Sequence, residues 1–384
     1  LAEFEVLQAT WDLIHGEYAD PASIDDAALI YGAAEGMVDA LGDEGHSRFL
    51  DPEAAEDFEE ATRGEFTGVG IEIDFARNLP VVIAPIDGSP ADEAGVRPGD
   101  TILAIDGQST ERLDQEDLAD LIRGDAGTEV TLTLLHEGED LPYDATMTRR
   151  TITLEPVSWR MLPDGVVHLR LAEFSAGAAE DLEAALRAAR DRGATGVVLD
   201  LRNNPGGLVA EAVGVASQFM PEGTPIFRQQ DRGQEAKPVN TVGTDGLWQE
   251  GPLAVLVNGG SASAAEIVGA ALRDNGRAPL YGETTYGTGT VLIPFEQPDG
   301  SVVLLGTALW LTADGDQIWK QGVEPDPGRV VPLPSSAGLS RPGDDPEVTA
   351  AELAASPDRQ LRAAFAGLTG TPLAVELPTP PLPR

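Results

Sequence analysis

The residues best suited to chemistry follow an apolar stretch, 253–257, in the run Asn258-Gly-Gly-Ser-Ala-Ser263. The apolar stretch predicts a buried strand, and residues 264–274 predict a helix. A turn from a strand into a helix exposes the side chain at its tip, and a helix N-terminus supplies free N–H groups where an oxyanion would form. Ser263 or Ser261 could therefore be a nucleophile, and the alternative is a serine that only caps the helix.

A second candidate turn has the sequence Leu199-Asp-Leu-Arg-Asn-Asn-Pro-Gly-Gly207 and follows another apolar strand, 196–201. If the two strands are parallel neighbours, both turns lie at the carboxyl edge of the sheet, where active sites gather in such folds. The paired glycines would let backbone N–H groups approach a substrate closely. A plain tight turn is the alternative.

Alternating strands and helices surround the two turns. The expected strands are 166–171, 196–201 and 253–257, and the expected helices are 178–192, 208–220 and 264–274. This alternation predicts a mainly parallel sheet covered on both faces. A hairpin of strands 291–295 and 302–311, turning at Asp299-Gly300, is expected to follow.

The whole chain is predicted to be α+β with four regions. Residues 1–62 have helical periodicity, and residues 63–156 combine short strands, turns and two short helices in one compact unit. Residues 157–335 form the α/β region with the partly parallel sheet. Residues 336–384 are expected to contain a helical segment and a loose proline-rich tail.

Composition excludes several classes of function. The chain has 384 residues and a formal net charge of −40, which argues against nucleic acid or an anionic membrane surface as partner. Cysteine is absent, so disulfides, thiolate metal sites and a cysteine nucleophile are excluded. No cofactor or metal motif is recognisable. The chain contains no apolar run long enough to span a membrane, and a removed signal peptide would fit its first residue, Leu1.

Taken together, these motifs resemble the S41-type C-terminal processing, or tail-specific, peptidases. The resemblance rests on five segments in the family's order, which are 66–71, 88–100, 199–207, 257–266 and 321–326. It implies a serine endopeptidase with Ser263, not Ser261, as nucleophile. It also implies an oxyanion hole formed by backbone N–H groups at Gly206 or Gly207 and at Ala264.

One feature departs from this family. The usual lysine base lies 25 residues after the serine, where this chain has Thr288, and a glutamine often found four residues later is Leu292. A serine hydroxyl still needs a base. The chain has only two lysines, and Lys320 is the more plausible because it precedes the segment 322–326.

Histidine offers another base. His15, His136 and His168 lie in predicted helices or strands and are expected to be structural, whereas His46 lies in a polar loop. The position of His46 resembles that of the catalytic histidine in tricorn-type relatives, which use Ser–His–Glu chemistry. That resemblance implies Glu324 as the third member, with Asp326 nearby. We expect His46 to be the base and keep Lys320 as the alternative.

The segment 88–100 is PDZ-like, so the unit at 63–156 is expected to bind an extended peptide by strand addition. Gly68, Val69, Gly70 and Ile71 are the candidates for holding a terminal carboxylate. The expected partners are proteins or peptides with accessible C-termini. A domain that only gates or braces the active site is the alternative.

The resemblance predicts an extracytoplasmic protease, with membrane anchoring through a segment outside this sequence left open. The principal rival is a catalytically inactive, peptide-binding pseudoprotease, which the loss of the lysine and glutamine motivates. Hydrolysis of a carbohydrate or lipid on the same serine has only the generic turn in its favour, and the PDZ-like unit speaks against it.

Overall fold

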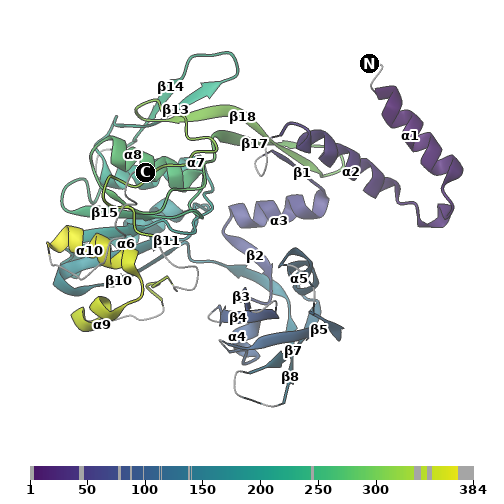
Figure 1. Ribbon diagram of the computed structural model, residues 1–384, viewed down its shortest axis with the longest axis horizontal. Helices are drawn as coiled ribbons and strands as arrows, with labels where there is room; N and C mark the ends of the chain where they lie inside the picture. Colours follow the sequence, from purple (N-terminus) through teal and green to yellow (C-terminus); the bar gives the residue numbers. More distant parts are fainter. Residues whose placement is uncertain are drawn as a thin grey trace, which may run out of the picture. The chain divides into compact units, whose positions relative to one another are not determined.

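The computed structural model describes residues 4–42, 47–76, 79–86, 89–97, 99–111, 113, 115–136, 139, 141–243, 246–332, 339–343 and 348–370. The chain divides into two compact units, Leu1–Ala55 with Val291–Thr307 and Glu56–Thr290 with Ala308–Arg384. Figure 1 traces the elements of both units.

The first unit joins N-terminal helices to a hairpin from late in the chain. Its helices are α1 (Phe4–Glu17), the 3-10 turn η1 (Pro21–Ser23), α2 (Asp26–Asp39) and the start of α3 (Pro52–Thr62). The side chain of Asp25 accepts hydrogen bonds from the first N–H groups of α2, as an N-cap does. The hairpin consists of β17 (Thr290–Glu296) and β18 (Val302–Thr312).

One strand near the end of the first 62 residues was not predicted, since the sequence indicated a loop at 42–49. Residues 48–50 form a strand, β1 (Arg48–Leu50), which pairs antiparallel with β18 so that Leu50 lies opposite Val302. The hydroxyl of Ser47 also accepts a hydrogen bond from the N–H of Gly306. The partner strand is some 250 residues away in the sequence, so local periodicity could not reveal it.

The start of the second unit contains the compact α+β region. Its elements are β2 (Glu65–Gly68), β3 (Ile71–Ala76), β4 (Leu79–Pro85), α4 (Pro90–Glu93), β5 (Thr101–Ile105), β6 (Gln108–Ser109), α5 (Gln115–Ile122), β7 (Glu129–Leu135), β8 (Tyr143–Thr148) and β9 (Arg150–Thr153). The main sheet has the order β3-β4-β5-β7-β8. Its core includes Ile102, Leu118, Val130 and Leu132, all nearly inaccessible to solvent.

The larger sheet of the second unit has the order β10-β11-β12-β15-β16. These strands are β10 (Val157–Met161), β11 (Val166–Leu171), β12 (Gly196–Asp200), β15 (Leu253–Val257) and β16 (Leu280–Gly282). Neighbours from β11 to β16 are parallel, and β10 is antiparallel at the edge. β13 (Pro225–Asp231) and β14 (Lys237–Asn240) belong to a separate sheet, where β13 pairs with β18.

The helices of this region are the 3-10 turn η2 (Pro163–Gly165), α6 (Ala178–Asp191), α7 (Val209–Phe219), α8 (Ala264–Asp274), α9 (Ala350–Ala355) and α10 (Arg359–Thr369). Leu361 and Phe365 of α10 pack with Val198 of β12 and Leu256 of β15. Because side chains alternate along a strand, α10 covers one face of the parallel sheet. The predicted α+β class with a partly parallel sheet is confirmed.

Candidate active site

Ser263 lies at the tip of the turn from β15 into α8, in an unusual backbone conformation. Its φ of 51° and ψ of −116° lie outside the regions that ordinary residues occupy. Such a conformation costs about 1–3 kcal/mol and persists only where the surroundings enforce it. The N–H of Ser263 donates to Glu266 Oε2 at 2.9 Å and to Thr288 Oγ1 at 2.8 Å, and these two bonds hold the strained turn.

Glu266 is the centre of this arrangement. Its side chain is fully buried in the first turn of α8. Oε1 accepts from the hydroxyl of Thr285 and the N–H of Gly287, and Oε2 accepts from the N–H of Ser263 and from both the N–H and the hydroxyl of Thr288. Five donors saturate one carboxylate, so Glu266 joins the Ser263 turn rigidly to the segment 285–288.

Thr288 occupies the position where the resembled family has its lysine. The residue is buried, and its hydroxyl donates to Glu266 at 2.7 Å while accepting the N–H of Ser263 at 2.8 Å. Thr288 therefore positions the backbone of the turn. A threonine hydroxyl bound in this way does not replace the lysine as a base, because it has no basic nitrogen.

Ser261 has a different environment from Ser263. It is fully buried, its hydroxyl donates to the carbonyl of Leu201 at 2.7 Å, and it accepts the N–H of Asn258 at 3.0 Å. The hydroxyl of Ser261 therefore both donates and accepts a hydrogen bond within the protein. Ser261 thus connects the end of β15 to the turn that follows β12.

The glycine turn after β12 lies directly against Ser263. A Cβ atom placed on Gly206 would stand 2.6 Å from the Cβ of Ser263 and 3.0 Å from the nitrogen of Ala264. Only glycine permits this approach at its φ of 103°. The sequence prediction that the two turns meet at the carboxyl edge of the sheet is therefore confirmed by the geometry.

The backbone N–H groups of this turn are not equivalent. Gly206 donates to the side chain of Asn204 at 2.8 Å. Gly207 forms a parallel bridge with Phe174, but the bonds of that bridge use the groups of Gly206 and Leu208 on either side. Among the residues that the structure describes, no hydrogen bond engages the N–H of the exposed Gly207 or of Ala264, the first residue of α8.

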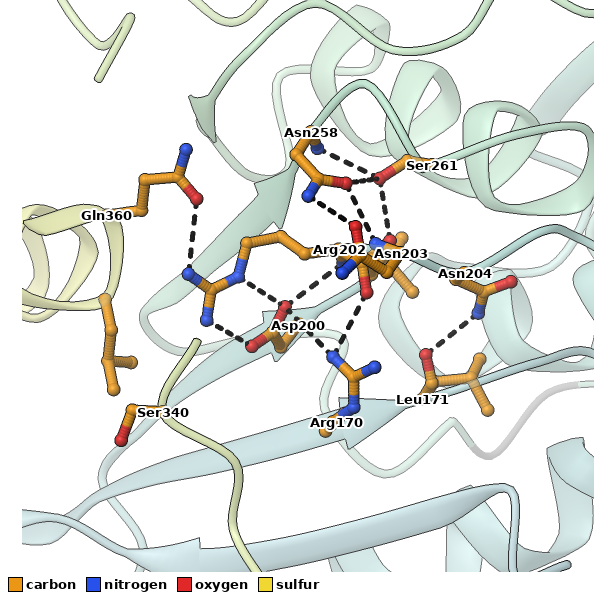
Figure 2. A network of polar contacts seen from close by, with 12 residues as sticks. Arg170, Leu171, Asp200, Arg202, Asn203, Asn204, Asn258, Ser261, Ser340 and Gln360 are labelled. Atoms are coloured by element: carbon orange, nitrogen blue, oxygen red, sulfur yellow. Dashed lines mark hydrogen bonds and ion pairs between the residues drawn. The ribbon is translucent and has the colours of Figure 1, made fainter. Parts of the chain in front are cut away.

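Arg202, at the start of the glycine turn, belongs to a buried ionic network, part of which is drawn in Figure 2. Asp200 accepts from the guanidinium of Arg202 at 2.8 and 2.6 Å and from Nε2 of His168 at 2.9 Å. Burial alone would raise the pKa of Asp200, but the adjacent Arg202 and the hydrogen bonds outweigh it and hold that pKa well below its usual range. Burial lowers the pKa of His168, although Asp200 opposes the shift.

The ionic network was not predicted from the sequence. A usable signal is the pair Asp200 and Arg202 at the end of an apolar strand, because charged residues next to a core must be paired. Asp358 and Gln360, which also bind Arg202, lie on the C-terminal helix and have no local signal.

Among the predicted base residues, His46 lies outside the described part of the chain. Lys320 is exposed, its Nζ stands 5.8 Å from the ring centroid of Trp319, and its N–H donates to the carbonyl of Gly287. Glu324 is exposed as well, and its backbone carbonyl accepts a hydrogen bond from Arg273 at 3.1 Å.

The other three histidines are engaged elsewhere, each by a carboxylate. His15 bonds to Asp26 at 2.8 Å, His136 to Asp100 at 2.8 Å and His168 to Asp200 at 2.9 Å.

The predicted peptide-binding residues line a cavity in the first α+β region. Its volume is about 220 Å³, and it lies between the start of β3 and the helix α5. The lining residues are Phe66, Thr67, Gly68, Val69, Gly70, Ile71, Ile73, Leu118, Ala119, Ile122 and Arg123. In the described part of the chain the N–H groups of Val69 and Gly70 have no hydrogen-bond partner, whereas their carbonyls accept from Ala91 and Ile86. Free N–H groups beside an apolar groove suit a terminal carboxylate.

Two negative findings apply to the described residues. These residues contain no cluster of three histidine, cysteine, aspartate or glutamate side chains that could hold a metal ion. None of their helices is long and apolar enough to cross a membrane.

Comparisons with known proteins agree with this geometry. Residues 165–327 match peptidase family S41, and residues 81–135 match the PDZ domain. The carboxyl-terminal-processing protease of Synechocystis is 40% identical over 323 residues, covering 82% of this chain and 74% of that protein. The carboxy-terminal processing protease CtpA of Bacillus subtilis is 36% identical over 324 residues, covering 84% and 68%.

Solved structures give the same result. The photosystem II D1 C-terminal processing protease is 28% identical with a TM-score of 0.53, covering 88% of this chain and 94% of that one. A putative S41 protease from Bacteroides fragilis shares the fold, with a TM-score of 0.56 at 21% identity over 82% and 88% of the two chains. These relatives support a protease over an inactive pseudoprotease. The chain therefore belongs to the carboxyl-terminal processing proteases of peptidase family S41, and it is a serine-type endopeptidase with a PDZ domain.

Proposed function

We propose that the protein cleaves peptide bonds through an acyl-enzyme on Ser263. The hydroxyl oxygen attacks the peptide carbonyl, the amine leaves with a proton from the base, and water then hydrolyses the ester. The N–H groups of Gly207 and Ala264 form the oxyanion hole, since that of Gly206 is used by Asn204. The observation that carries the proposal is the strained Ser263 turn packed against Gly206.

A pair of serine variants tests this assignment. Ser263→Ala abolishes the cleavage of fluorescent casein and leaves the melting temperature nearly unchanged, because the half-buried hydroxyl contributes little packing. Ser261→Ala lowers the melting temperature, because it removes a buried hydrogen bond, but it retains cleavage. The reverse pattern of activity would move the nucleophile to Ser261.

We further propose that His46 is the general base and that Glu324 orients it. The other three histidines are each engaged by a carboxylate, and Thr288 and the exposed Lys320 are poor substitutes. A neutral imidazole with an ordinary pKa of about 6.5 suits proton transfer at neutral pH. Lys320 remains the alternative base.

The base is tested by two variants assayed across pH. His46→Ala loses at least about 10² in kcat, the usual contribution of a general base, and Lys320→Ala loses little. The kcat/KM of the wild type falls below a pH of about 6.5, where the unperturbed imidazole takes up a proton. An active His46→Ala enzyme beside an inactive Lys320→Ala enzyme would give the role to the lysine.

We also propose that the PDZ domain recognises the C-terminal segments of protein substrates. The support is the groove at Gly68–Ile71 with its two free N–H groups and apolar lining. Arg123 at the end of this groove adds a positive charge, although Asp57 lies 3.7 Å from it. Gly68, Val69, Gly70 and Ile71 are assigned to binding the carboxylate end of the peptide.

Peptides with a free or an amidated C-terminus test recognition. A peptide with an apolar, free C-terminus binds the Ser263→Ala protein, and amidation weakens binding by about tenfold, because the N–H groups lose a charged acceptor. Fluorescence polarisation of labelled peptides measures the difference. Equal binding of both forms would leave the domain with a gating or bracing role.

We propose that the chain has four regions, which are a helical region at 1–62, the PDZ domain at 63–156, the catalytic domain at 157–335 and a C-terminal segment at 336–384.

We also propose that this protease works outside the cytoplasm. Fractionation of cells that express the full protein tests the location. Recovery in the cytoplasmic fraction alone would contradict it.

A further inference from the structure

Two buried polar residues begin the C-terminal helix α10, beyond the residues 165–327 that match the peptidase family. Asp358 is the N-cap of this helix and Gln360 lies in its first turn. Both are fully buried, although their residue types are mostly exposed in proteins. Buried groups of this kind are kept only where they are paired, so their partners indicate their role.

The shared partner is Arg202, in the turn after β12. Its Nη1 donates to Asp358 Oδ1 at 2.9 Å and to Gln360 Oε1 at 3.2 Å, while Nε and Nη2 donate to Asp200. The guanidinium is fully buried between the two carboxylates. Figure 2 shows Gln360 on one side of Arg202 and Asp200 on the other.

Asp358 and Gln360 are themselves held in place. Asp358 accepts the N–H of Leu361 at 2.9 Å and the N–H of Ser340 at 3.1 Å. The amide of Gln360 donates to the carbonyl of Val331 at 2.8 Å. The two residues thus form a fixed support, which determines where the guanidinium lies.

Arg202 begins the glycine turn 202–207, called the catalytic turn below, and residues within two positions of Arg202 bind the Ser263 turn. The carbonyl of Leu201, one residue before Arg202, accepts from the hydroxyl of Ser261. The carbonyl of Asn204, two residues after it, accepts the N–H of Ala262 at 2.9 Å. Ala262 immediately precedes Ser263, and the side chain of Asn204 accepts the N–H of Gly206.

We infer that Asp358 and Gln360 are positioning residues for the catalytic turn, which they hold through Arg202 so that the N–H of Gly207 meets the Ser263 site. This inference rests on the proposed oxyanion hole. Both residues are fully buried, so we expect them to act through Arg202 and not on the substrate itself. Loss of the Asp358 charge would leave Arg202 with one carboxylate and release one side of the guanidinium, so the turn would no longer be fixed.

The reaction of the full chain with a fluorophosphonate probe tests the inference. The serine hydroxyl gives its proton to the base, and its oxygen bonds to the probe's phosphorus and displaces fluoride while the phosphoryl oxygen occupies the oxyanion hole. Mass spectrometry identifies the labelled residue. In Asp358→Asn the maximal labelling rate falls at least about tenfold, a partial form of the loss of 10²–10³ seen when an oxyanion donor is removed. The probe concentration at half-maximal rate changes less than about twofold, because the turn orients reacting atoms and does not bind the probe's leaving group or tail.

A matched control is Phe365→Leu, which loosens the same helix on its apolar side without touching Arg202. We expect Phe365→Leu to lower the melting temperature about as much as Asp358→Asn does and to keep the maximal labelling rate of the wild type. Gln360→Met, which removes the second contact to Arg202, gives a smaller fall in the same rate and serves if Asp358→Asn does not fold.

Three results would overturn the inference. One is a folded Asp358→Asn or Gln360→Met protein with the maximal rate of the wild type. Another is a loss of labelling rate in Phe365→Leu equal to that in Asp358→Asn, which would mean that the loss comes from a less stable helix. A wild-type protein labelled at a residue other than Ser263 would contradict both the proposed function and this inference. A wild type labelled at Ser263, with variants that keep its maximal labelling rate, would contradict the inference alone.

Discussion

Two glycine-rich turns of this protein present backbone N–H groups, and they are supported in opposite ways. The PDZ turn at 66–71 rests on apolar residues such as Leu118 and opens into a cavity. The catalytic turn at 202–207 rests on buried charges, with Arg202 between Asp200 and Asp358. An apolar support tolerates varied peptides, whereas a reaction needs donors fixed to a fraction of an ångström.

Alanine at one glycine of each turn gives the largest expected effects. A Cβ on Gly206 would stand 2.6 Å from that of Ser263, so Gly206→Ala displaces the catalytic turn and lowers kcat by at least about 10². A Cβ on Gly70 would overlap the side chain of Ser89 in the PDZ domain, so Gly70→Ala weakens peptide binding.

The two glycine variants are compared by casein cleavage, fluorophosphonate labelling and peptide polarisation. Gly206→Ala keeps peptide binding, and Gly70→Ala keeps labelling of Ser263. Loss of both properties in either variant would mean that the two turns are not independent.

Substitution of Thr288 is expected to have the next largest effect. It lowers kcat and leaves peptide binding by the PDZ domain unchanged. Thr288→Val removes the hydroxyl that joins the N–H of Ser263 to Glu266, and the lost buried hydrogen bonds cost about 1–3 kcal/mol. If that cost falls on the transition state, kcat drops about 5- to 150-fold. Thr288→Ser keeps the hydroxyl and is expected to keep most activity, whereas a loss in Thr288→Ser equal to that in Thr288→Val would mean that the hydroxyl alone does not account for the effect.

The smallest effect is a dependence of stability on pH. Burial lowers the pKa of His168 below its ordinary value of about 6.5, so below that pH the unfolded chain binds a proton that the folded chain does not. Stability therefore falls as the pH drops below about 6.5. The lowered pKa of Asp200 adds stability above a pH of about 3.9, so it is not lost in this window.

Melting temperatures at pH 5 and pH 8 measure this dependence. In His168→Gln, whose amide can still donate to Asp200, the difference between the two melting temperatures becomes smaller. An unchanged difference would assign the acid sensitivity to other groups.

The sequence predicted the elements whose signals are local. The strand 253–257, the helix 264–274 and the strand 166–171 were predicted with the bounds that the structure has. Apolar runs and glycine pairs report the local chain, and they predicted two turns at one edge of the sheet. The resemblance to the S41 peptidases then implied that Ser263 and Gly206 lie together.

The contacts that fix the site come from distant segments and have no local signal. Asp358 accepts a hydrogen bond from Arg202, 156 residues away in the sequence, and Thr288 accepts one from the N–H of Ser263, 25 residues away. A threonine at the lysine position suggested the loss of a function, and only the structure shows its hydroxyl bound to Glu266. The strand β1 was missed for the same reason, because its partner β18 is far along the chain.

The central claim, that Ser263 is the nucleophile of a working protease, is tested most directly by the site of fluorophosphonate labelling in the intact protein. The account predicts one labelled peptide that contains Ser263, complete loss of label in Ser263→Ala, and retained label in a folded Ser261→Ala. A wild-type protein that cleaves casein but carries no label on Ser263 would contradict it.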